Sequence, residues 1–599
     1  MYANRNEYRK RKPLAIGVED YKRIIDKSYY YMDKTLLIRE LLDQGGTVSL
    51  FTRPRRFGKT LALSMVKTFF ESEIDERGNP IDNSRYFDGM KIMDTGEEYT
   101  THMGQYPVIS LSLKSANQPD FELAYQMMDE QISGEFKRHR YVLDKDVLLE
   151  DERERFEALM LRRADRAKLA TSLKFLSDCL KKYHGKNVII LIDEYDVPLE
   201  NAYFHGFYEQ MIGFVRSLFE SALKTNGSLE FAVITGCLRI SKESIFTGLN
   251  HLKIVTLLNH QYAEYFGFTQ KEVEDMLRDY QMTDRMDIVK KWYDGYLFGD
   301  TEVYNPWSVI NYVDDSVEGE RFPKPYWSNT SSNSIVRELI EYADSGAKKE
   351  IEDLIAGGTI YKPVHEEITY GDIHVSQDNL WNFLFFTGYL KMEKQKLEGN
   401  QIYLTLSIPN EEIRYIYQNT IREWFESQVK QTDFRNFYQS MLTGDTDKME
   451  AFINGQLSKS ISYYDNAENF YHGYMVGIFN SLDGYEVYSN KESGNGRPDI
   501  QLMPFNPRKP AVILELKQAK KFSEMEKKCE EALKQIEVQK YDNSLKEEGY
   551  EEILKYAICF CKKSCRIKNL RFISTDAAVS YLTDSLTGIL KKEYDIDGV

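Results

Sequence analysis

Three consecutive residues near the N-terminus, Gly58-Lys59-Thr60, have the types and order that bind nucleotide phosphates. Glycine lets the backbone approach an anion, lysine reaches the β- and γ-phosphates, and the threonine hydroxyl can ligate Mg²⁺. They stand between an apolar run at 48–51 and a helical pattern, which is the context such a loop requires. The full pattern has a glycine at position 53, where this chain has Arg53. Arg55 and Arg56 add charge where a triphosphate would lie and could substitute for the lost loop geometry.

The second half of a nucleotide site is predicted at the ends of two further apolar strands. Asp193 ends the run 188–192, where a Mg²⁺-binding carboxylate belongs, and Glu194 could polarise the attacking water. Thr235 ends a third strand and could sense the γ-phosphate, and Arg239 could stabilise transition-state charge. Taken separately, these motifs could be a helix cap and a strand exit. Their order and context favour nucleotide binding, because parallel strands bring such ends to one crevice, whereas Arg53 leaves hydrolysis less supported.

A second group of charged residues lies near the C-terminus and predicts metal-dependent nuclease chemistry. Asp499 begins one strand pattern, and Glu515 and Lys517 stand two residues apart in the next. Alternation puts the last two on one face, and a hairpin of 499–503 with 511–517 would bring Asp499 beside them. Two carboxylates sharing a face can hold Mg²⁺, which activates water for attack on a phosphodiester. Lys517 could orient that water or stabilise the transition state.

Further residues could support this site. Glu468 lies on a predicted helix where it could add a third acidic group, and His472 follows one turn later. Gln535 and Tyr541 could contact the phosphate backbone. The alternative is a solvated hairpin with an ordinary Glu/Lys pair. The otherwise buried run 511–516 favours function, because charges in such a run are costly unless paired or metal-bound.

The elements that must position these groups suggest an α/β multidomain protein. Strands alternate with helices over residues 15–250, which predicts a parallel P-loop sheet covered on both faces. The pattern predicts helices and loops over residues 251–330, and mainly helices with a short strand at 401–408 over residues 331–440. It predicts a second α/β unit over residues 465–560. The division we expect is an ATPase-like domain at 1–250, a helical lid or extension at 251–330, a helical linker at 331–440 and a nuclease-like domain at 441–599.

Composition bounds these readings. The 599 residues are 42% hydrophobic and 29% charged, as in an ordinary soluble protein, and they carry a net charge of −16. Residues 1–60 alone have an excess of seven positive charges. We expect a cytoplasmic protein, because the chain has no signal peptide or membrane-spanning run, and six cysteines form no disulfide scaffold. Cys559, Cys561 and Cys565 lack a partner cluster for zinc. The run 29–31 (Tyr-Tyr-Tyr) could stack on adenine, although a core position is the commoner use.

The motifs FTRPRRFGKTLALSMV, VIILIDEYDVPL, ITGCLRISKESIFTGLNHL and WYDGYLFGDTEVYNPWSV resemble bacterial predicted AAA-ATPase-like proteins. GRPDIQLM, ILELK and LKYAICFCKKSCRI resemble the PD-(D/E)XK nuclease domain that closes those chains. The resemblance implies ATP and Mg²⁺ as cofactors, with Lys59, Thr60, Asp193 and Glu194 in the nucleotide site. It also implies a restriction-endonuclease-like fold with Asp499, Glu515 and Lys517 as its motif.

Three hypotheses follow. The first is an ATP-controlled, Mg²⁺-dependent nuclease acting on nucleic acid, DNA in preference to RNA, bound in a local groove without a membrane. The second is a nucleotide-dependent interaction switch whose nuclease-like domain only binds nucleic acid or a protein. Residues 511–599 favour this reading somewhat, because their 16 basic and 16 acidic residues give no basic surface. The third is a structural protein with vestigial sites. A homo-oligomer is compatible with each.

Overall fold

The structure, a computed structural model, describes most of the chain, and two compact units divide it. Unit 1 comprises Met1–Leu339 and Thr359–Tyr417, and unit 2 comprises Ile340–Gly358 and Gln418–Val599. The described residues are 11–44, 46–75, 77–239, 245–246, 251–320, 322–328, 336–337, 341, 344–366, 370, 376–431, 433–459, 467–479, 482–489, 493 and 496–573. Only the backbone is described at 345, 422, 424–431, 458–459, 467–470, 473 and 571–573. The four-part domain division stays a prediction.

Unit 1 is built on a five-stranded sheet in the order β2-β3-β4-β1-β5, and every pairing in it is parallel. The predicted parallel sheet is therefore confirmed. Strands β1 and β3 are buried along their whole length, because helices lie on both faces of the sheet. The strands are β1 Val48–Thr52, β2 Val108–Ser112, β3 Val188–Asp193, β4 Leu229–Gly236 and β5 Leu252–Val255.

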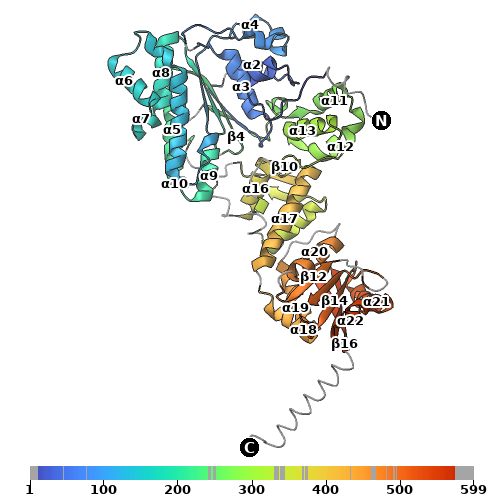
Figure 1. The fold of residues 1–599 in the computed structure, drawn as a ribbon. Helices are drawn as coiled ribbons and strands as arrows, with labels where there is room; N and C mark the ends of the chain where they lie inside the picture. Colours follow the sequence, from blue (N-terminus) through green and yellow to red (C-terminus); the bar gives the residue numbers. More distant parts are fainter. Residues whose placement is uncertain are drawn as a thin grey trace, which may run out of the picture. The chain divides into compact units, whose positions relative to one another are not determined.

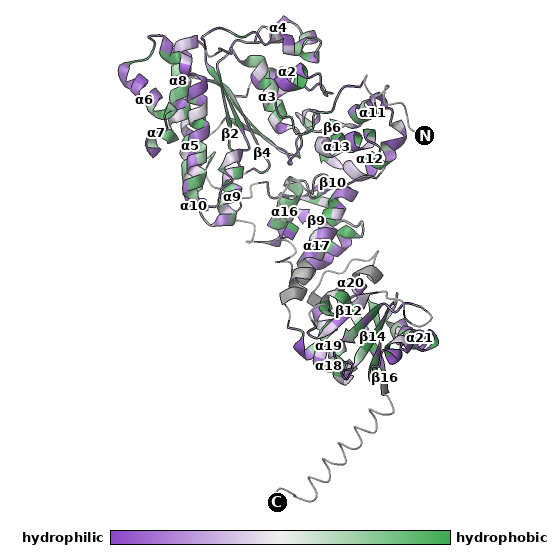
Figure 2. Cartoon of the chain, viewed as in Figure 1, coloured by the Kyte–Doolittle hydropathy of each residue, from purple (hydrophilic) through white to green (hydrophobic). Residues whose placement is uncertain are grey.

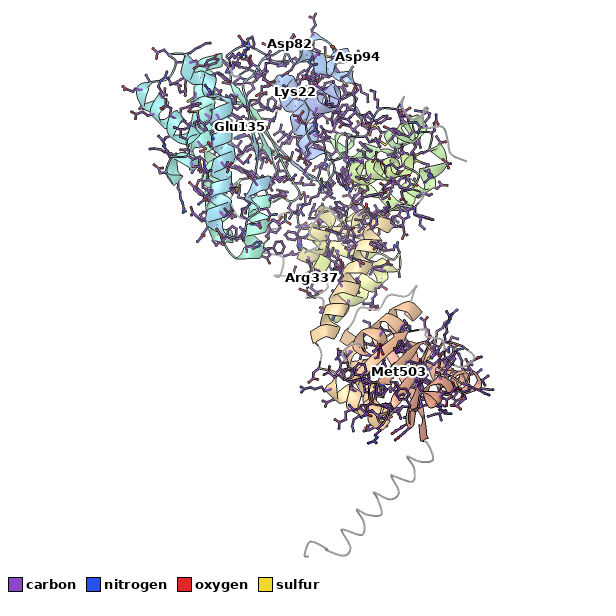
Figure 3. All side chains as sticks on the ribbon, in the orientation of Figure 1. Lys22, Asp82, Asp94, Glu135, Arg337 and Met503 are labelled. Carbon is purple, nitrogen blue, oxygen red and sulfur yellow. The ribbon has the colours of Figure 1, made fainter. Side chains whose placement is uncertain are left out.

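Helices cover this sheet on both sides. In Figure 1, α3 lies on one side of the strands, and α5 and α8 lie on the other. Glu135 of α5, labelled in Figure 3, accepts a hydrogen bond from the backbone of Ser110 in β2 and so attaches its helix to the sheet. Figure 2 shows hydrophobic residues along β2 and β4 and hydrophilic residues on α5 and α6. The helices are α1 Tyr21–Asp26, α2 Leu36–Gln44, α3 Lys59–Phe70, α4 Glu97–Thr100, α5 Phe121–Arg138, α6 Glu150–Met160, α7 Arg166–Ala170, α8 Ser172–His184, α9 Val197–His205 and α10 Tyr208–Phe219.

Two small sheets follow in unit 1. The first has the order β6-β8-β7 and is accompanied by α11, α12 and α13, and the second has the order β10-β11-β9 and is accompanied by α16. Helix α11 begins with a capping box, since Thr269 and Glu272 cap it reciprocally. The elements are β6 Phe268–Thr269, α11 Gln270–Asp279, α12 Met286–Tyr293, β7 Tyr296–Phe298, β8 Thr301–Tyr304, α13 Pro306–Val317, β9 Ile360–Pro363, α16 Gln377–Phe386, β10 Lys391–Glu398 and β11 Gln401–Ser407.

Unit 2 contains a mixed five-stranded sheet in the order β12-β13-β14-β15-β16, in which only β14 and β15 run parallel. One face packs on α18, α19 and α20, and α21 covers the other. Met503 of β13, labelled in Figure 3, belongs to the core under α21. The elements are α15 Ser345–Ile355, α18 Arg435–Thr443, α19 Thr446–Lys459, α20 Ala467–Phe479, β12 Tyr485–Ser489, β13 Ile500–Pro504, β14 Ala511–Gln518, α21 Met525–Val538, α22 Asn543–Glu547, β15 Glu552–Cys561 and β16 Ser564–Ile573.

The structure differs from the sequence expectation mainly in short or polar strands. Residues 251–330 contain β5 to β8 in addition to helices, and residues 331–440 contain three strands where only one was expected. In β10, the sequence KMEKQKLE buries only Met392. Such an edge strand lacks the apolar alternation that periodicity detects. In the described part of the chain, no helix combines the length and the apolar character needed to span a membrane.

Helix α17 Glu411–Gln431 begins in unit 1 and continues into unit 2. Its first turn is fixed by Glu412, whose buried carboxylate accepts hydrogen bonds from the Ser308 hydroxyl at 2.8 Å and the Trp327 backbone N–H at 2.8 Å. Burial raises the pKa of Glu412 to about 7, and these donors offset it only in part. The neutral carboxyl is therefore the form that the fold favours.

This pKa predicts a pH-dependent stability. The pKa of Glu412 is higher in the folded than in the unfolded chain. The contribution of the protonated Glu412 to the free energy of unfolding is therefore complete below about pH 4.5 and is lost as the pH rises through about 7. We expect Glu412→Gln, which stays neutral, to gain about 2 kcal/mol over wild type between pH 5 and pH 8. Denaturant unfolding followed by tryptophan fluorescence measures this. The control is Glu411→Gln, the neighbouring half-exposed carboxylate. An equal pH response of both variants would contradict the assignment.

Candidate functional site

The loop 53–58 joins the end of β1 to α3 and has an unusual backbone. Gly58 precedes α3 with φ of 82°, and Arg56 also has a positive φ, of 69°. Lys59, the first residue of α3, is buried, and its ammonium donates to the backbone carbonyl oxygens of Arg53 and Pro54, each at 2.9 Å. These bonds hold the loop closed around a cation. An anion could compete with these neutral carbonyl oxygens for the Lys59 ammonium, because hydrogen bonds between charged groups are stronger.

Asp193 connects the ends of β3 and β4 to the first turn of α3. The Thr60 hydroxyl donates to its Oδ2 at 2.6 Å, and the Thr235 hydroxyl donates to its Oδ1. This proximity follows from the sheet order, because β4 lies between β3 and β1 and all three strands run the same way. The structure therefore brings Thr60, Asp193 and Thr235 together, as the motif order predicts.

The next residue, Glu194, lies beside this group and faces a cleft. Its backbone has φ of 53°, a left-handed conformation that is uncommon outside glycine. Burial raises the pKa of Glu194, and the Asp193 carboxylate raises it further. The strained turn thus presents a carboxylate with increased proton affinity to the space above Lys59 and Thr60.

Arg53 occupies a different environment from the other two arginines of the loop. Its side chain is fully buried, and one of its nitrogens donates to the carbonyl oxygens of Thr52 and Val255 at 2.9 and 3.1 Å. Its guanidinium lies 4.9 Å from the Phe298 ring centroid. Burial lowers the pKa of Arg53 to about 9. Arg53 is therefore part of the core beneath the loop, directed at strand β5.

Arg55 and Arg56 both line the cleft. The Arg55 guanidinium pairs with Glu200 of α9 at 2.5 Å, and that of Arg56 lies 4.4 Å from the Trp307 ring centroid. Arg55 remains about one-third exposed. Each arginine is therefore already held by one partner at the edge of the space that a phosphate would occupy.

The cleft has a volume of about 730 Å³ and a polar and an apolar part. Its polar wall contains Gly58, Lys59, Thr60, Arg55 and Glu194. The apolar wall comes from the N-terminal segment, β6 and α13, and it consists of Tyr30, Tyr31, Met32, Phe268, Trp307 and Ile310. Two tyrosines of the run 29–31 thus line the cleft. Arg239 does not, because it pairs instead with Glu366 at 3.5 Å.

In unit 2, the predicted hairpin is present and brings Asp499 to β14. Strands β13 and β14 pair antiparallel with Ile500 opposite Leu514, and the Asp499 carboxylate accepts the Leu516 backbone N–H at 2.7 Å. Alternation places Glu515 and Lys517 on the face that α21 covers. The Lys517 ammonium donates to Glu515 Oε1 at 2.8 Å. The three motif residues therefore form one group.

Glu515 carries the most informative atom of this group. Its side chain is only 2% exposed, and Oε1 accepts bonds from Lys517 and from the Gln535 amide at 2.6 Å. Its other oxygen, Oε2, is buried without a hydrogen-bond partner among the described residues. Burial raises the pKa of Glu515, and the Asp499 charge raises it further, while Lys517 opposes both. A free carboxylate oxygen beside a second carboxylate fits a hard divalent cation such as Mg²⁺.

The supporting residues have mixed outcomes. Gln535 lies on α21 as predicted, but it contacts Glu515, and its amide also lies 3.2 Å from the Tyr541 hydroxyl. His472 Nε2 lies 3.1 Å from the Asp499 carbonyl oxygen and 3.2 Å from Ser489 Oγ. Glu468 falls in α20, but its side chain is outside the described residues. Within the described residues, no group of three or more metal-ligating side chains forms.

Sequence reasoning missed residues that hold the site from behind. Asp196 is buried and accepts the backbone N–H groups of Cys237 and Leu238 at 2.7 and 3.0 Å, which fixes the turn after β4. Glu200, one helical turn after Asp196, neutralises Arg55. The segment after Asp193 carries three carboxylates within seven residues. This cluster of acidic residues, in a chain with an arginine-rich loop, was the sequence feature that could have indicated an ion pair with that loop.

Comparison with known proteins agrees with this geometry. Residues 15–246 match the family described as predicted AAA-ATPase, and residues 466–570 match the PD-(D/E)XK nuclease superfamily. The chain thus carries a predicted AAA-ATPase-like domain followed by a PD-(D/E)XK nuclease superfamily domain. It is also similar to an uncharacterized protein in the vnfD 5′ region of Azotobacter chroococcum mcd 1. The identity is 24% over 509 residues, which cover 82% of this chain and 87% of that protein.

The different environments of Arg53 and Lys59 predict different effects on nucleotide affinity. We expect Lys59→Met to weaken ATP–Mg²⁺ binding by more than about tenfold, because a charge-assisted contact is lost. Arg53→Met should change it by less than about threefold, because its side chain is directed into the core. Isothermal titration of the full chain measures both. A loss with Arg53→Met as large as with Lys59→Met, at unchanged circular dichroism, would contradict this placement.

Proposed function

We propose that unit 1 binds and hydrolyses ATP with Mg²⁺. The observation that carries this proposal is the joining of Thr60, Asp193 and Thr235 by hydrogen bonds beside a cleft that also contains Lys59. Lys59 would hold the terminal phosphates, and Thr60 and Asp193 would hold Mg²⁺, which neutralises phosphate charge. Glu194 would accept a hydrogen bond from the attacking water. Tyr31 and Trp307, in the apolar wall, would contact the base.

The two cleft arginines support triphosphate as the ligand. Arg55 has an acidic partner, Glu200, and Arg56 has an aromatic partner, Trp307. Both remain close enough to the cleft to line it. A ligand carrying several negative charges could exchange for these partners, whereas a neutral ligand would gain nothing from doing so.

We propose further that unit 2 hydrolyses phosphodiester bonds in nucleic acid, with DNA as the first substrate to test. The unpartnered Oε2 of buried Glu515 carries this proposal. Asp499 and Glu515 would hold Mg²⁺, which supplies an activated water when bound. Gln535 and Lys517 orient the Glu515 carboxylate through its other oxygen, and Lys517, one-quarter exposed, can also reach a phosphate.

A cleavage assay tests this. We expect the full chain with Mg²⁺ to cut DNA, and Asp499→Asn and Glu515→Gln to lower the rate by at least about a hundredfold, since each removes a metal ligand. Activity should fall with decreasing pH over a range above that of an ordinary glutamate, because the raised pKa of Glu515 leaves it protonated there. Glu486→Gln, on strand β12, is the control. Equal cutting by wild type and Asp499→Asn would disprove this assignment. Single- and double-stranded DNA and RNA are compared.

A second candidate is a nucleotide-dependent switch whose unit 2 binds without cutting. The observation that favours it is the pair of carboxylates, without a third ligand among the described residues. In that case wild type binds nucleic acid, and none is cut with Mg²⁺ or Mn²⁺. The same assay, read together with binding, separates the two candidates.

Control by ATP is also part of the proposal, because contacts connect loop 53–58 to the segment 359–417. Glu200, which holds Arg55, is also hydrogen-bonded by the Tyr370 hydroxyl. Tyr370 is fully buried, and its ring lies 5.5 Å from that of Phe383 in α16. At Gly388, which follows α16, an added Cβ would lie 2.9 Å from Pro54 Cβ. A change at Arg55 or Pro54 would therefore displace side chains packed on α16.

The other arginine has a comparable connection to α17. Trp307, which holds Arg56, precedes Ser308, whose hydroxyl donates to Glu412 in the first turn of α17. The Asn410 side chain, just before this helix, donates to the Asp294 carbonyl oxygen at 2.7 Å. Because α17 continues into unit 2, nucleotide binding at Arg56 would act on the helix that joins the two units.

Tyr370→Phe tests this control. The substitution removes one hydroxyl away from the cleft, so we expect ATP affinity to change by less than about threefold. The effect of ATP on the cleavage rate, whether activation or inhibition, should shrink at least about threefold, because Glu200 then holds Arg55 alone. The control is Tyr361→Phe, an exposed tyrosine of the same segment. An unchanged ATP effect in Tyr370→Phe would show that control follows another route.

A further inference from the structure

The lysines of unit 2 fall into two groups that differ in their partners. Nine cations of the described part of this unit form ion pairs with carboxylates, namely Arg435, Lys448, Lys517, Lys528, Lys546, Lys555, Lys563, Arg566 and Lys568. Exposed cations without such a pair among the described residues occur singly or as one neighbouring pair elsewhere in the unit, namely Lys349, Arg508, Lys509, Lys540 and Lys562, and the largest group of them lies after Lys517. Lys520, Lys521, Lys527 and Lys534 are exposed and have no carboxylate within ion-pair distance among the described residues. These four lysines, called the lysine strip below, are close in sequence and directly follow Lys517.

The lysine strip lies beside the candidate nuclease site. Strand β14 ends at Gln518, so Lys520 and Lys521 begin the connection from the strand that carries Glu515 to helix α21. Lys527 and Lys534 are seven residues apart on α21, about two turns, and therefore share a face. Gln535, next to Lys534, contacts Glu515. Glu531 lies between the two helix lysines. Its hydrogen bond from Lys528 lowers its pKa, and the charges of Lys527 and Lys517 both help to lower it.

The acidic residues of α21 form their ion pairs with cations outside this strip, and only Glu531 also interacts with the charge of a strip lysine, Lys527. Glu526 and Glu530 pair with Lys568 of β16, and Glu531 pairs with Lys528. The helix thus has acidic groups directed at strand β16 and unpaired lysines next to the site. In an acidic chain of net charge −16, unpaired positive charge at this place indicates an anionic partner.

An exposed aromatic ring lies between the two halves of the strip. Phe522, directly after Lys521, is 58% exposed, although phenylalanine is one of the residues most often buried. An exposed ring flanked by lysines is the combination that binds unpaired bases, because the ring stacks on a base while lysines contact phosphates. A protein partner would gain from the ring, but four unpaired ammonium groups match a polyanion better.

We propose that the lysine strip and Phe522 bind a single strand of nucleic acid and lead its backbone to Asp499, Glu515 and Lys517. The lysines contact consecutive phosphates, and Phe522 stacks on one base. The proposal rests on the proposed nuclease function for its orientation toward Glu515, but strand binding itself needs no cleavage.

Binding is tested with the full chain and a fluorescein-labelled single-stranded 20-mer DNA in EDTA, where no metal-dependent cutting occurs. Fluorescence anisotropy is measured over a series of NaCl concentrations. Replacing the four lysines by glutamine should reduce the slope of log Kobs against log salt by roughly 2 to 3, because each phosphate contact on a single strand contributes about 0.7. Phe522→Ala should weaken binding by about fivefold to a hundredfold at each salt concentration, because one stacking contact is lost, and should leave the slope unchanged.

The matched control is the quadruple variant of Arg435, Lys448, Arg508 and Lys509 to glutamine, which removes the same charge from exposed positions of unit 2. Its slope should stay within about 0.7 of wild type. Equal slopes for the strip and control variants would overturn the proposal, as would an absence of binding by wild type. A labelled 20-bp duplex serves as a second probe, and tighter binding of the duplex than of the strand would also overturn it.

The outcomes separate this proposal from the nuclease function. If wild type cuts DNA and the lysine-strip variant keeps the wild-type slope, the strip is wrong and the nuclease stands. If wild type binds the strand through the strip but never cuts, the strip is right and the nuclease function fails.

Discussion

Burying a carboxylate in or at the end of an apolar strand is unfavourable unless hydrogen bonds or cations compensate its charge, and both candidate sites of this protein are built on such a carboxylate. Asp193 ends β3, and two threonine hydroxyls satisfy it. Glu515 interrupts β14, where Lys517 and Gln535 satisfy one of its oxygens and leave the other without a partner. The surrounding elements are arranged to bring these donors in. The sheet order brings Thr235 of β4 and Thr60, which follows β1, to the same edge of the sheet as Asp193, and α21 places Gln535 over Glu515.

The arginines of loop 53–58 show how one local sequence can serve three purposes. Arg53 stabilises the junction between β1 and β5, Arg55 pairs with a carboxylate of α9, and Arg56 stacks on a tryptophan of α13. A glycine at position 53 would leave the Val255 carbonyl without its arginine donor. The departure from the usual phosphate-loop pattern is therefore a feature of the core in this protein, and the cleft keeps its own complement of positive charge.

Parts of both candidate sites could be expected from the sequence, because those parts depend on local patterns. An apolar run followed by Gly58-Lys59-Thr60, and alternation that puts Glu515 and Lys517 on one face, specify their geometry within a few residues. The parallel arrangement of the first sheet was equally accessible from the alternation of strands and helices, whereas the order of its strands was not predicted. Long-range contacts were not, since nothing near Arg239 indicates its pairing with Glu366, more than a hundred residues later. Strand β10 was missed because charged residues on an edge strand resemble a helix in composition. The contact of Gln535 with Glu515 was not predicted, because it depends on how α21 crosses the sheet.

Strand β5 has a consequence for where the ATPase-like module ends. The match to the AAA-ATPase family stops at residue 246, whereas β5 occupies Leu252–Val255 and pairs with β1 along its whole length. A protein cut at 246 would expose the hydrogen-bonding edge of β1, the strand that leads into loop 53–58. It would also remove the acceptor that holds the buried guanidinium of Arg53. Open edges of this kind pair with other chains, so such a fragment would aggregate. The smallest autonomous form of this module therefore extends beyond the region by which it is recognised.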